Sequence, residues 1–281
     1  MLFYSKFTSA TPKKSGRNDG IKTRFRIINP MDQRTSFQNA SNDAIAAILS
    51  VPKEQNGKGI ILLHCFTCTK HHRVMRGLAE CLSANGFTVL RFDFSGNGES
   101  GGKLEDATYT KMLGEVRSAV TLLEGMGIRH IGVAGHSMGA MLSLLAAHED
   151  SRIAAVGFIS GSSQAARVRE VFPADAIEKA EREGSSEAFV YGRSIMLKRE
   201  FLLDIEKFNV GQAAAALHRP MLVVHGTKDE IIPLFHARQI YSWAKEPKSL
   251  ELMDGVDHLF RDETHLRKLQ ATVCSWFAHN L

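Results

Sequence analysis

The sequence predicts an α/β protein whose central sheet is mostly parallel and carries helices on both faces. Short apolar segments of β-prone residues alternate along the chain with amphipathic segments of helical period, at the spacing of strand–helix–strand units. A Gly-x-Ser-x-Gly motif, Gly135–Gly139, stands where one apolar segment meets an Ala- and Leu-rich one. The 281 residues, 44% of them hydrophobic, suffice for a sizeable core.

The distribution of charge argues against a nucleic-acid-binding protein. The net charge is +5, but residues 1–26 hold seven of the 35 Lys and Arg residues and a single acidic residue. The remaining chain is nearly neutral, so the folded body lacks the basic face that nucleic acid requires. We expect residues 1–21 to form a basic tail ahead of a catalytic domain at residues 22–281, with an organelle transit peptide as the alternative.

The length of the apolar runs and the number of cysteines argue against a membrane-spanning protein and against a disulfide-rich one. No apolar run reaches the roughly 18 residues of a membrane span. Four cysteines in a chain of this length do not make a disulfide framework, which favours a reducing compartment and a cytoplasmic location.

The expected elements follow from period, capping residues and turn residues. The expected strands are Lys22–Ile28, Ala44–Val51, Gly59–His64, Phe87–Phe92, His130–Ala134, Ile153–Ile159, Pro220–Val224 and Ser249–Leu252, with a turn-rich stretch over Asn29–Asp43. The expected helices are His72–Asn85, Tyr109–Glu124, Ser137–Ala147, Leu234–Ala244 and Arg261–His279.

Gly161–Leu217 interrupts this alternation and is too long for a plain connection. It has helical patterns of its own at Ala174–Arg182 and Arg199–Phe208, with apolar faces. We expect an inserted helical lid over the carboxyl edge of the sheet, where ligands bind in open α/β sheets.

Ser137 is the candidate nucleophile. A tight reversal from strand to helix strains its central residue, and Gly135 and Gly139 remove side chains that would collide. The hydroxyl is then exposed at a helix N-terminus, where developing negative charge is favoured. A serine that only caps the helix is the structural alternative.

A serine hydroxyl needs a base, and the base needs an orienting acid. His258 lies in a loop between a short strand and the last helix, and Asp229 follows the Pro220–Val224 strand. The chain order Ser137, Asp229, His258 is that of a hydrolase triad. Glu230 is a competing acid, whereas we interpret Asp257 as structural because it adjoins His258.

With these motifs in place, the chain resembles the α/β-hydrolase family, and within it the esterases grouped with cinnamoyl and feruloyl esterases and serine-aminopeptidase-like hydrolases. The segments that carry the resemblance are Ile60–Thr67, Arg91–Ser100, Gly135–Gly139, His225–Pro233 and Gly255–His258. The resemblance implies the α/β-hydrolase fold, a lid at residues 161–217 and a structural role for Asp93.

The resemblance also implies an oxyanion hole in two backbone N–H groups, those of Met138 and Phe66. The loop after the Gly59–His64 strand reads His64-Cys65-Phe66-Thr67-Cys68, where the family usually has His-Gly-Phe-Thr. This variant is similar to that of hydrolases fused to OsmC-type peroxide-reducing domains.

Cys65 and Cys68 admit three interpretations: two small residues that fill a tight loop, a redox pair that modulates the oxyanion hole, or metal ligands together with the nearby His64, His71 and His72. We expect the first. Cys81 and Cys274 fall on helix faces and are expected in the core.

The sequence therefore predicts a serine esterase that acts on a small-molecule ester with a short-chain or aromatic acyl group, without metal or organic cofactor. Peptidase, thioesterase or lactonase activity would use the same triad. A thiol-redox protein and a non-catalytic binding protein are the alternatives from other classes. We expect a monomer or a homodimer.

Overall fold

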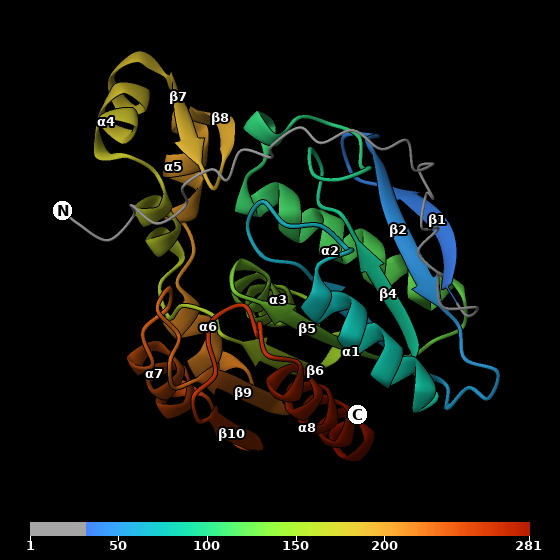
Figure 1. Cartoon of the computed structure of the whole chain (residues 1–281). Helices are drawn as coiled ribbons and strands as arrows, with labels where there is room; N and C mark the ends of the chain where they lie inside the picture. Colours follow the sequence, from blue (N-terminus) through green and yellow to red (C-terminus); the bar gives the residue numbers. More distant parts are fainter. Residues whose placement is uncertain (1–31) are drawn as a thin grey trace, which may run out of the picture. The chain divides into compact units, whose positions relative to one another are not determined.

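The computed structural model describes residues 32–281, and its central feature is an eight-stranded sheet in the order β1-β2-β4-β3-β5-β6-β9-β10 (Figure 1). The strands are β1 Asp32–Gln38, β2 Ala44–Ser50, β3 Lys58–Leu63, β4 Thr88–Phe92, β5 His130–His136, β6 Ile153–Ile159, β9 Met221–Gly226 and β10 Lys248–Met253. β2 pairs antiparallel with β1 and β4, and every other neighbouring pair is parallel. The predicted mostly parallel sheet is confirmed.

Helices cover both faces of this sheet, as predicted. The α-helices of residues 32–281 are α1 Arg73–Ala84, α2 Tyr109–Gly125, α3 Met138–Glu149, α4 Ala174–Glu183, α5 Arg199–Ile205, α6 Val210–Ala216, α7 Phe235–Trp243 and α8 Glu263–Asn280, of which α4 and α5 lie in the insertion beside the sheet. α1 and α8 pack into one apolar cluster, which includes Leu78 and Phe277, whereas α2, α3 and α7 pack into the cluster on the other face. No helix within residues 32–281 combines the length and apolarity that crossing a bilayer demands.

The parallel strands bring the candidate site residues to one edge. β3, β5, β9 and β10 run in the same direction, so their carboxyl ends face the same side of the sheet. The loop with Phe66 follows β3, and Ser137 follows β5 directly. Asp229 follows β9, and His258 follows β10. Residues far apart in sequence therefore meet at one rim.

The N-terminal prediction is corrected in one respect. The strand expected at Lys22–Ile28 and the basic tail lie outside the described residues. The stretch predicted as turn-rich contains β1, which forms a hairpin with β2. Phe37 packs edge-on against Phe92 with ring centroids 5.3 Å apart, which anchors β1. The polar residues of this edge strand obscure its alternation in the sequence.

The segment 161–217 contains the two predicted helices, as α4 and α5, although α5 already ends at Ile205. Between them lies a hairpin that the sequence analysis missed, with β7 at Ser185–Val190 and β8 at Arg193–Lys198. Tyr191 and Gly192 have positive φ angles of 50° and 79°, which suits a two-residue hairpin turn. Phe189, Tyr191 and Met196 are exposed on this hairpin.

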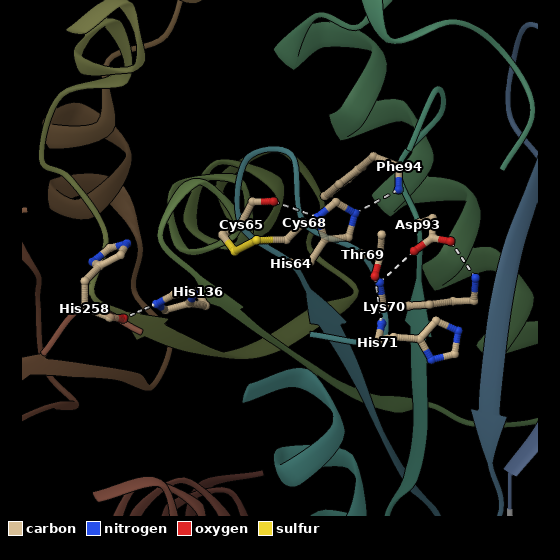
Figure 2. The surroundings of a disulfide bond; sticks show 10 residues. All are labelled: His64, Cys65, Cys68, Thr69, Lys70, His71, Asp93, Phe94, His136 and His258. Atoms are coloured by element: carbon tan, nitrogen blue, oxygen red, sulfur yellow. Dashed lines mark hydrogen bonds and ion pairs between the residues drawn. A yellow bond between two sulfur atoms is a disulfide. The ribbon is translucent and has the colours of Figure 1, made fainter. Parts of the chain in front are cut away.

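A buried ion pair ties the loop after β3 to the loop after β4. Lys70 and Asp93 have side chains 2% and 0% exposed, and their Nζ and Oδ2 lie 2.5 Å apart. Asp93 also accepts hydrogen bonds from the backbone N–H groups of Lys70 and Glu99. The structural role predicted for Asp93 thus follows from its contacts (Figure 2).

We predict that Asp93→Asn lowers the free energy of unfolding by about 3 kcal/mol, because it leaves the buried Lys70 ammonium with only the half-exposed Glu99 carboxylate as its counter-ion. Urea denaturation monitored by circular dichroism measures the effect. Arg117→Ala is the matched control: it removes the exposed ion pair with Glu149 and should cost about 1 kcal/mol or less. Equal losses for both variants would contradict the prediction.

Candidate active site

Ser137 occupies a strained turn between β5 and α3. Its φ and ψ are 58° and −116°, a backbone conformation that residues other than glycine rarely adopt. A Cβ on Gly135 would lie 2.0 Å from the carbonyl oxygen of Gly139, and one on Gly139 would lie 2.2 Å from that of Leu63. Only glycine fits at both positions. The tight reversal predicted around Ser137 is therefore present.

Asp229 and His258 meet, as the sequence predicts. His258 Nδ1–H donates to Asp229 Oδ2 at 2.8 Å, since a carboxylate oxygen only accepts. Asp229 Oδ1 accepts from the backbone N–H groups of Ile231 and Ile232 at 3.0 and 2.8 Å. The side chain of Asp229 is fully buried and that of His258 is 8% exposed. The carboxylate is thus held rigidly against the imidazole.

The two competing acids, Glu230 and Asp257, make no hydrogen bond with the imidazole of His258 among the described residues. Glu230 is exposed and makes no hydrogen bond among the described residues. Asp257 accepts from the backbone N–H and the guanidinium of Arg261, at 2.9 and 2.8 Å, and so begins the turn into α8. His225 approaches Asp229 Oδ2 at 3.4 Å, but its Nε2–H donates to the carbonyl of Ile232.

His136, which the sequence analysis passed over, connects the nucleophile turn to the His258 loop. Its Nε2–H donates to the backbone carbonyl of His258 at 2.8 Å, and the two rings lie 4.9 Å apart (Figure 2). The Ser137 hydroxyl is half-buried and makes no hydrogen bond within residues 32–281. His136, next to Ser137 in the chain, is therefore hydrogen-bonded to the His258 loop, whereas no hydrogen bond joins Ser137 to His258 within these residues. The sequence did hold a signal for His136, because it is an ionisable side chain inside the Gly-x-Ser-x-Gly motif.

His64 orients the loop after β3. Its Nε2 accepts from the backbone N–H of Phe94 at 3.2 Å, so its Nδ1–H donates to the carbonyl of Cys65 at 2.8 Å (Figure 2). The C=O and N–H of a trans peptide point in opposite directions. The N–H of Phe66 therefore points away from His64, and neither it nor the N–H of Met138 finds an acceptor among the described residues.

Cys65 and Cys68 form a disulfide, which corrects the expectation that they are merely two small residues in a tight loop (Figure 2). The bond closes a ring around Phe66 and Thr67, and Thr67 has a positive φ of 56°. Cys65 is buried, whereas Cys68 is half-buried. The predicted core positions of the other two cysteines hold for buried Cys274, while Cys81 is only half-buried.

Burial keeps several imidazoles of this region neutral at pH 7. It lowers the pKa of His72 to about 4 and that of His136 well below its usual value near 6.5. It also lowers the pKa of His64. The contacts that these rings make are therefore those of neutral donors and acceptors, not of cations.

An apolar pocket of about 320 Å³, counting the part open to solvent, adjoins the loop after β3. Phe66 contributes from that loop, and its ring contacts those of Phe172 and Phe201 in the insertion, with centroids 5.8 and 6.5 Å apart. Met112 and Ile195 complete much of the apolar lining. The insertion at 161–217 therefore shares a pocket with the loop that carries Phe66.

Comparison with known proteins agrees with this architecture. A family model described as the alpha/beta hydrolase fold matches residues 59–177. Human mitochondrial palmitoyl-protein thioesterase ABHD10 is 24% identical over 234 residues, which cover 79% of this chain and 74% of that protein.

Two solved structures show the same fold over most of the chain. The esterase domain of a Rhodothermus marinus protein has a TM-score of 0.70 at 25% identity, covering 87% of this chain and 97% of that one. Est1E from Butyrivibrio proteoclasticus with bound ferulic acid has a TM-score of 0.73 at 24% identity, covering 88% and 98%. With the sheet order and the strained turn at Ser137 described above, these matches show that the chain has the α/β-hydrolase fold.

Proposed function

We propose that the chain is a serine hydrolase that cleaves carboxylic esters through a Ser137–His258–Asp229 triad. The observation that carries the proposal is the hydrogen bond from His258 Nδ1 to the buried Asp229, beside a serine held in a strained turn. With Nδ1 protonated, His258 Nε2 has the free lone pair that a general base requires.

In the proposed reaction the Ser137 oxygen attacks the acyl carbon while His258 takes its proton. His258 then protonates the leaving alcohol, and an acyl-enzyme remains. A water molecule, deprotonated by His258, attacks the acyl carbon and releases the acid. Asp229 stabilises the imidazolium in both steps. The N–H groups of Phe66 and Met138 would bind the oxyanion, because they are unpaired and Phe66 N–H points away from His64.

The pocket beside Phe66 is the proposed acyl site. Its lining is mainly apolar, with Phe66, Phe172 and Phe201 in mutual contact. Short-chain or aromatic acyl groups fit such a lining, since burial of apolar surface favours binding. The insertion at 161–217 would act as a lid, because it supplies two of these three rings.

Thioester cleavage is the second candidate. The same triad attacks a thioester carbonyl, and the similarity to a protein named palmitoyl-protein thioesterase extends over 79% of the chain. A thiol is a better leaving group than an alcohol, so protonation by His258 would matter less for thioesters. To distinguish the two preferences, kcat/KM is measured for an oxyester and a thioester with the same acyl group. Both substrates are tested in wild type and in His258→Gln.

The nucleophile assignment predicts that Ser137→Ala abolishes covalent labelling by a fluorophosphonate probe and lowers ester turnover about 10⁶-fold. Gel fluorescence and a p-nitrophenyl ester assay measure these effects. Ser143→Ala is the matched control on the same helix: its hydroxyl donates to the Gly139 carbonyl, so it should label as wild type does. Undiminished labelling of Ser137→Ala would overturn the assignment.

The acid assignment predicts that Asp229→Asn lowers kcat about 10⁴-fold, because the amide no longer enforces the Nδ1–H tautomer of His258. Asp257→Asn should retain kcat within a few-fold, since Asp257 binds Arg261 instead. Steady-state kinetics on one ester compares the two. If the Asp257 variant lost more activity than the Asp229 variant, the triad would need a different acid.

The acyl-site assignment predicts that Phe172→Ala shifts the optimum of kcat/KM toward longer acyl chains, because truncation of the ring enlarges the pocket. A p-nitrophenyl ester series of increasing acyl length measures the shift. Phe189→Ala is the control: Phe189 is 71% exposed on the β7–β8 hairpin and does not line the pocket. An unchanged optimum in Phe172→Ala would place the acyl group elsewhere.

A further inference from the structure

A sulfur atom and two imidazoles lie close together at the loop that carries Phe66. Cys65 Sγ, one ring nitrogen of His72 and one ring nitrogen of His136 all lie within 4.8 Å of one another. Cys68 Sγ is bonded to Cys65 Sγ and so belongs to the same cluster. The ester-cleaving mechanism uses none of these four side-chain atoms.

Both imidazoles of the cluster have an unused nitrogen. His136 is fully buried, and its Nε2–H donates to the carbonyl of His258, which leaves Nδ1 with a lone pair and no partner. His72 Nδ1 is also buried without a partner. The two rings stack almost in parallel, 5.6 Å apart at 7°. Buried imidazole nitrogens without a hydrogen bond are costly, so each calls for an explanation, and a bound ion is one of them.

Other histidines of the region do not share this arrangement. His64 uses both ring nitrogens, one with Phe94 and one with Cys65. His71 is exposed and approaches Glu99 at 3.9 Å. His225 and His236 also have an unpaired nitrogen, but within residues 32–281 only the group around Cys65 has the geometry to hold a metal ion.

We propose that reduction of the Cys65–Cys68 disulfide creates a zinc site made of Cys65, Cys68, His72 and His136. In the disulfide state neither sulfur is a thiolate, so the site is closed. In the dithiol state Cys65 Sγ lies near the two imidazole nitrogens, and Cys68, three residues along the same loop, would supply the second sulfur of a structural Cys₂His₂ ligand set. The spacing Cys-x₂-Cys-x₃-His supplies three ligands from one segment, and His136 supplies the fourth from the end of β5.

The reductant is a dithiol. One of its thiolates attacks Cys68 Sγ, the more exposed sulfur, and the S–S bond breaks with the electron pair leaving on Cys65 Sγ, which takes up a proton. The second thiolate of the reductant attacks the mixed disulfide, so that Cys68 leaves as a thiol and the reductant becomes a disulfide. Zn²⁺ then displaces one proton from each cysteine as it binds.

The surroundings suit a tetrahedral zinc ion. Ligand atoms of such an ion lie roughly 3.3–3.8 Å apart, so the imidazole nitrogens and Cys65 Sγ need only small shifts once the S–S bond has opened. His136 already has the support that zinc-bound histidines show, since its other nitrogen donates to a backbone carbonyl. Half-buried Cys68 and His72 provide the entry path.

The test is a titration of the full chain with Co²⁺, a spectroscopic substitute for Zn²⁺, after anaerobic reduction by a water-soluble phosphine. We expect one equivalent of Co²⁺ to produce thiolate-to-metal charge-transfer absorption and the visible bands of a tetrahedral ion, and Zn²⁺ to remove both. The oxidised chain should produce neither. This readout does not depend on hydrolysis, so a failed esterase assignment would leave it intact.

Variants identify the ligands. Cys65→Ser and Cys68→Ser should abolish the charge-transfer band of the bis-thiolate site, and His72→Gln should weaken Zn²⁺ binding at least about 100-fold, more than loss of an outer hydrogen bond does. Cys81→Ala is the matched control, because Cys81 and Cys274 form the other thiol pair. Unchanged binding in Cys65→Ser or His72→Gln, or its loss in Cys81→Ala, would overturn the proposal.

A measurement on the wild type alone tests the site even if the variants do not fold. In the reduced chain, Zn²⁺ should slow alkylation of Cys65 and Cys68 by iodoacetamide at least tenfold and leave that of Cys81 unchanged, as mapped by mass spectrometry. Equal alkylation rates with and without Zn²⁺ would refute the site.

Discussion

The close contact between the start of α3 and the end of β3 is the constraint on which the site depends. A side chain on Gly139 would collide with the carbonyl oxygens of Leu63 and His64, at 2.2 and 2.8 Å from its Cβ. Because the glycine is there, the nucleophile turn rests directly on the strand whose loop carries Phe66. The distance between the proposed nucleophile and the proposed oxyanion donor is therefore set by backbone contact rather than by side chains that could adjust.

Three buried histidines fix the loops of this rim in the same way. His64 donates to the carbonyl of Cys65, His136 to that of His258, and His225 to that of Ile232, each at 2.8 Å. Burial lowers the pKa of all three, so each remains a neutral donor at pH 7. The loops after β3, β9 and β10 are thus held by hydrogen bonds that do not change with protonation near neutral pH. His258 differs, because its partner is the carboxylate of Asp229.

The sequence predicted the parts of the fold whose signals are local. The buried strands and long amphipathic helices show their periods directly, and the glycines around Ser137 reveal the turn. β1 and the β7–β8 hairpin were missed because their alternation is incomplete: polar residues dominate β1, and exposed Phe189 and Met196 resemble a helical apolar face. His136 was missed for another reason, and His72 was named only as a possible metal ligand near the cysteines. The contact between these two rings joins β5 to the start of α1, and no spacing along the chain displays it.

The hydrogen bond of His64 explains how Cys65 fits where the hydrolases that this loop resembles usually have glycine. His64 already determines the direction of the Cys65 carbonyl, so the peptide before Phe66 keeps its orientation without glycine at position 65. Cys65 Sγ lies within 4.8 Å of a ring nitrogen of His72 and of His136, and each of these rings has an Nδ1 without a partner among residues 32–281. The N–H of Phe66, the proposed oxyanion donor, and the sulfur of the sulfur–imidazole cluster thus belong to the same loop. A change in the bonding of Cys65 would therefore act on the loop that carries Phe66 and, through His136, on the loop that carries His258.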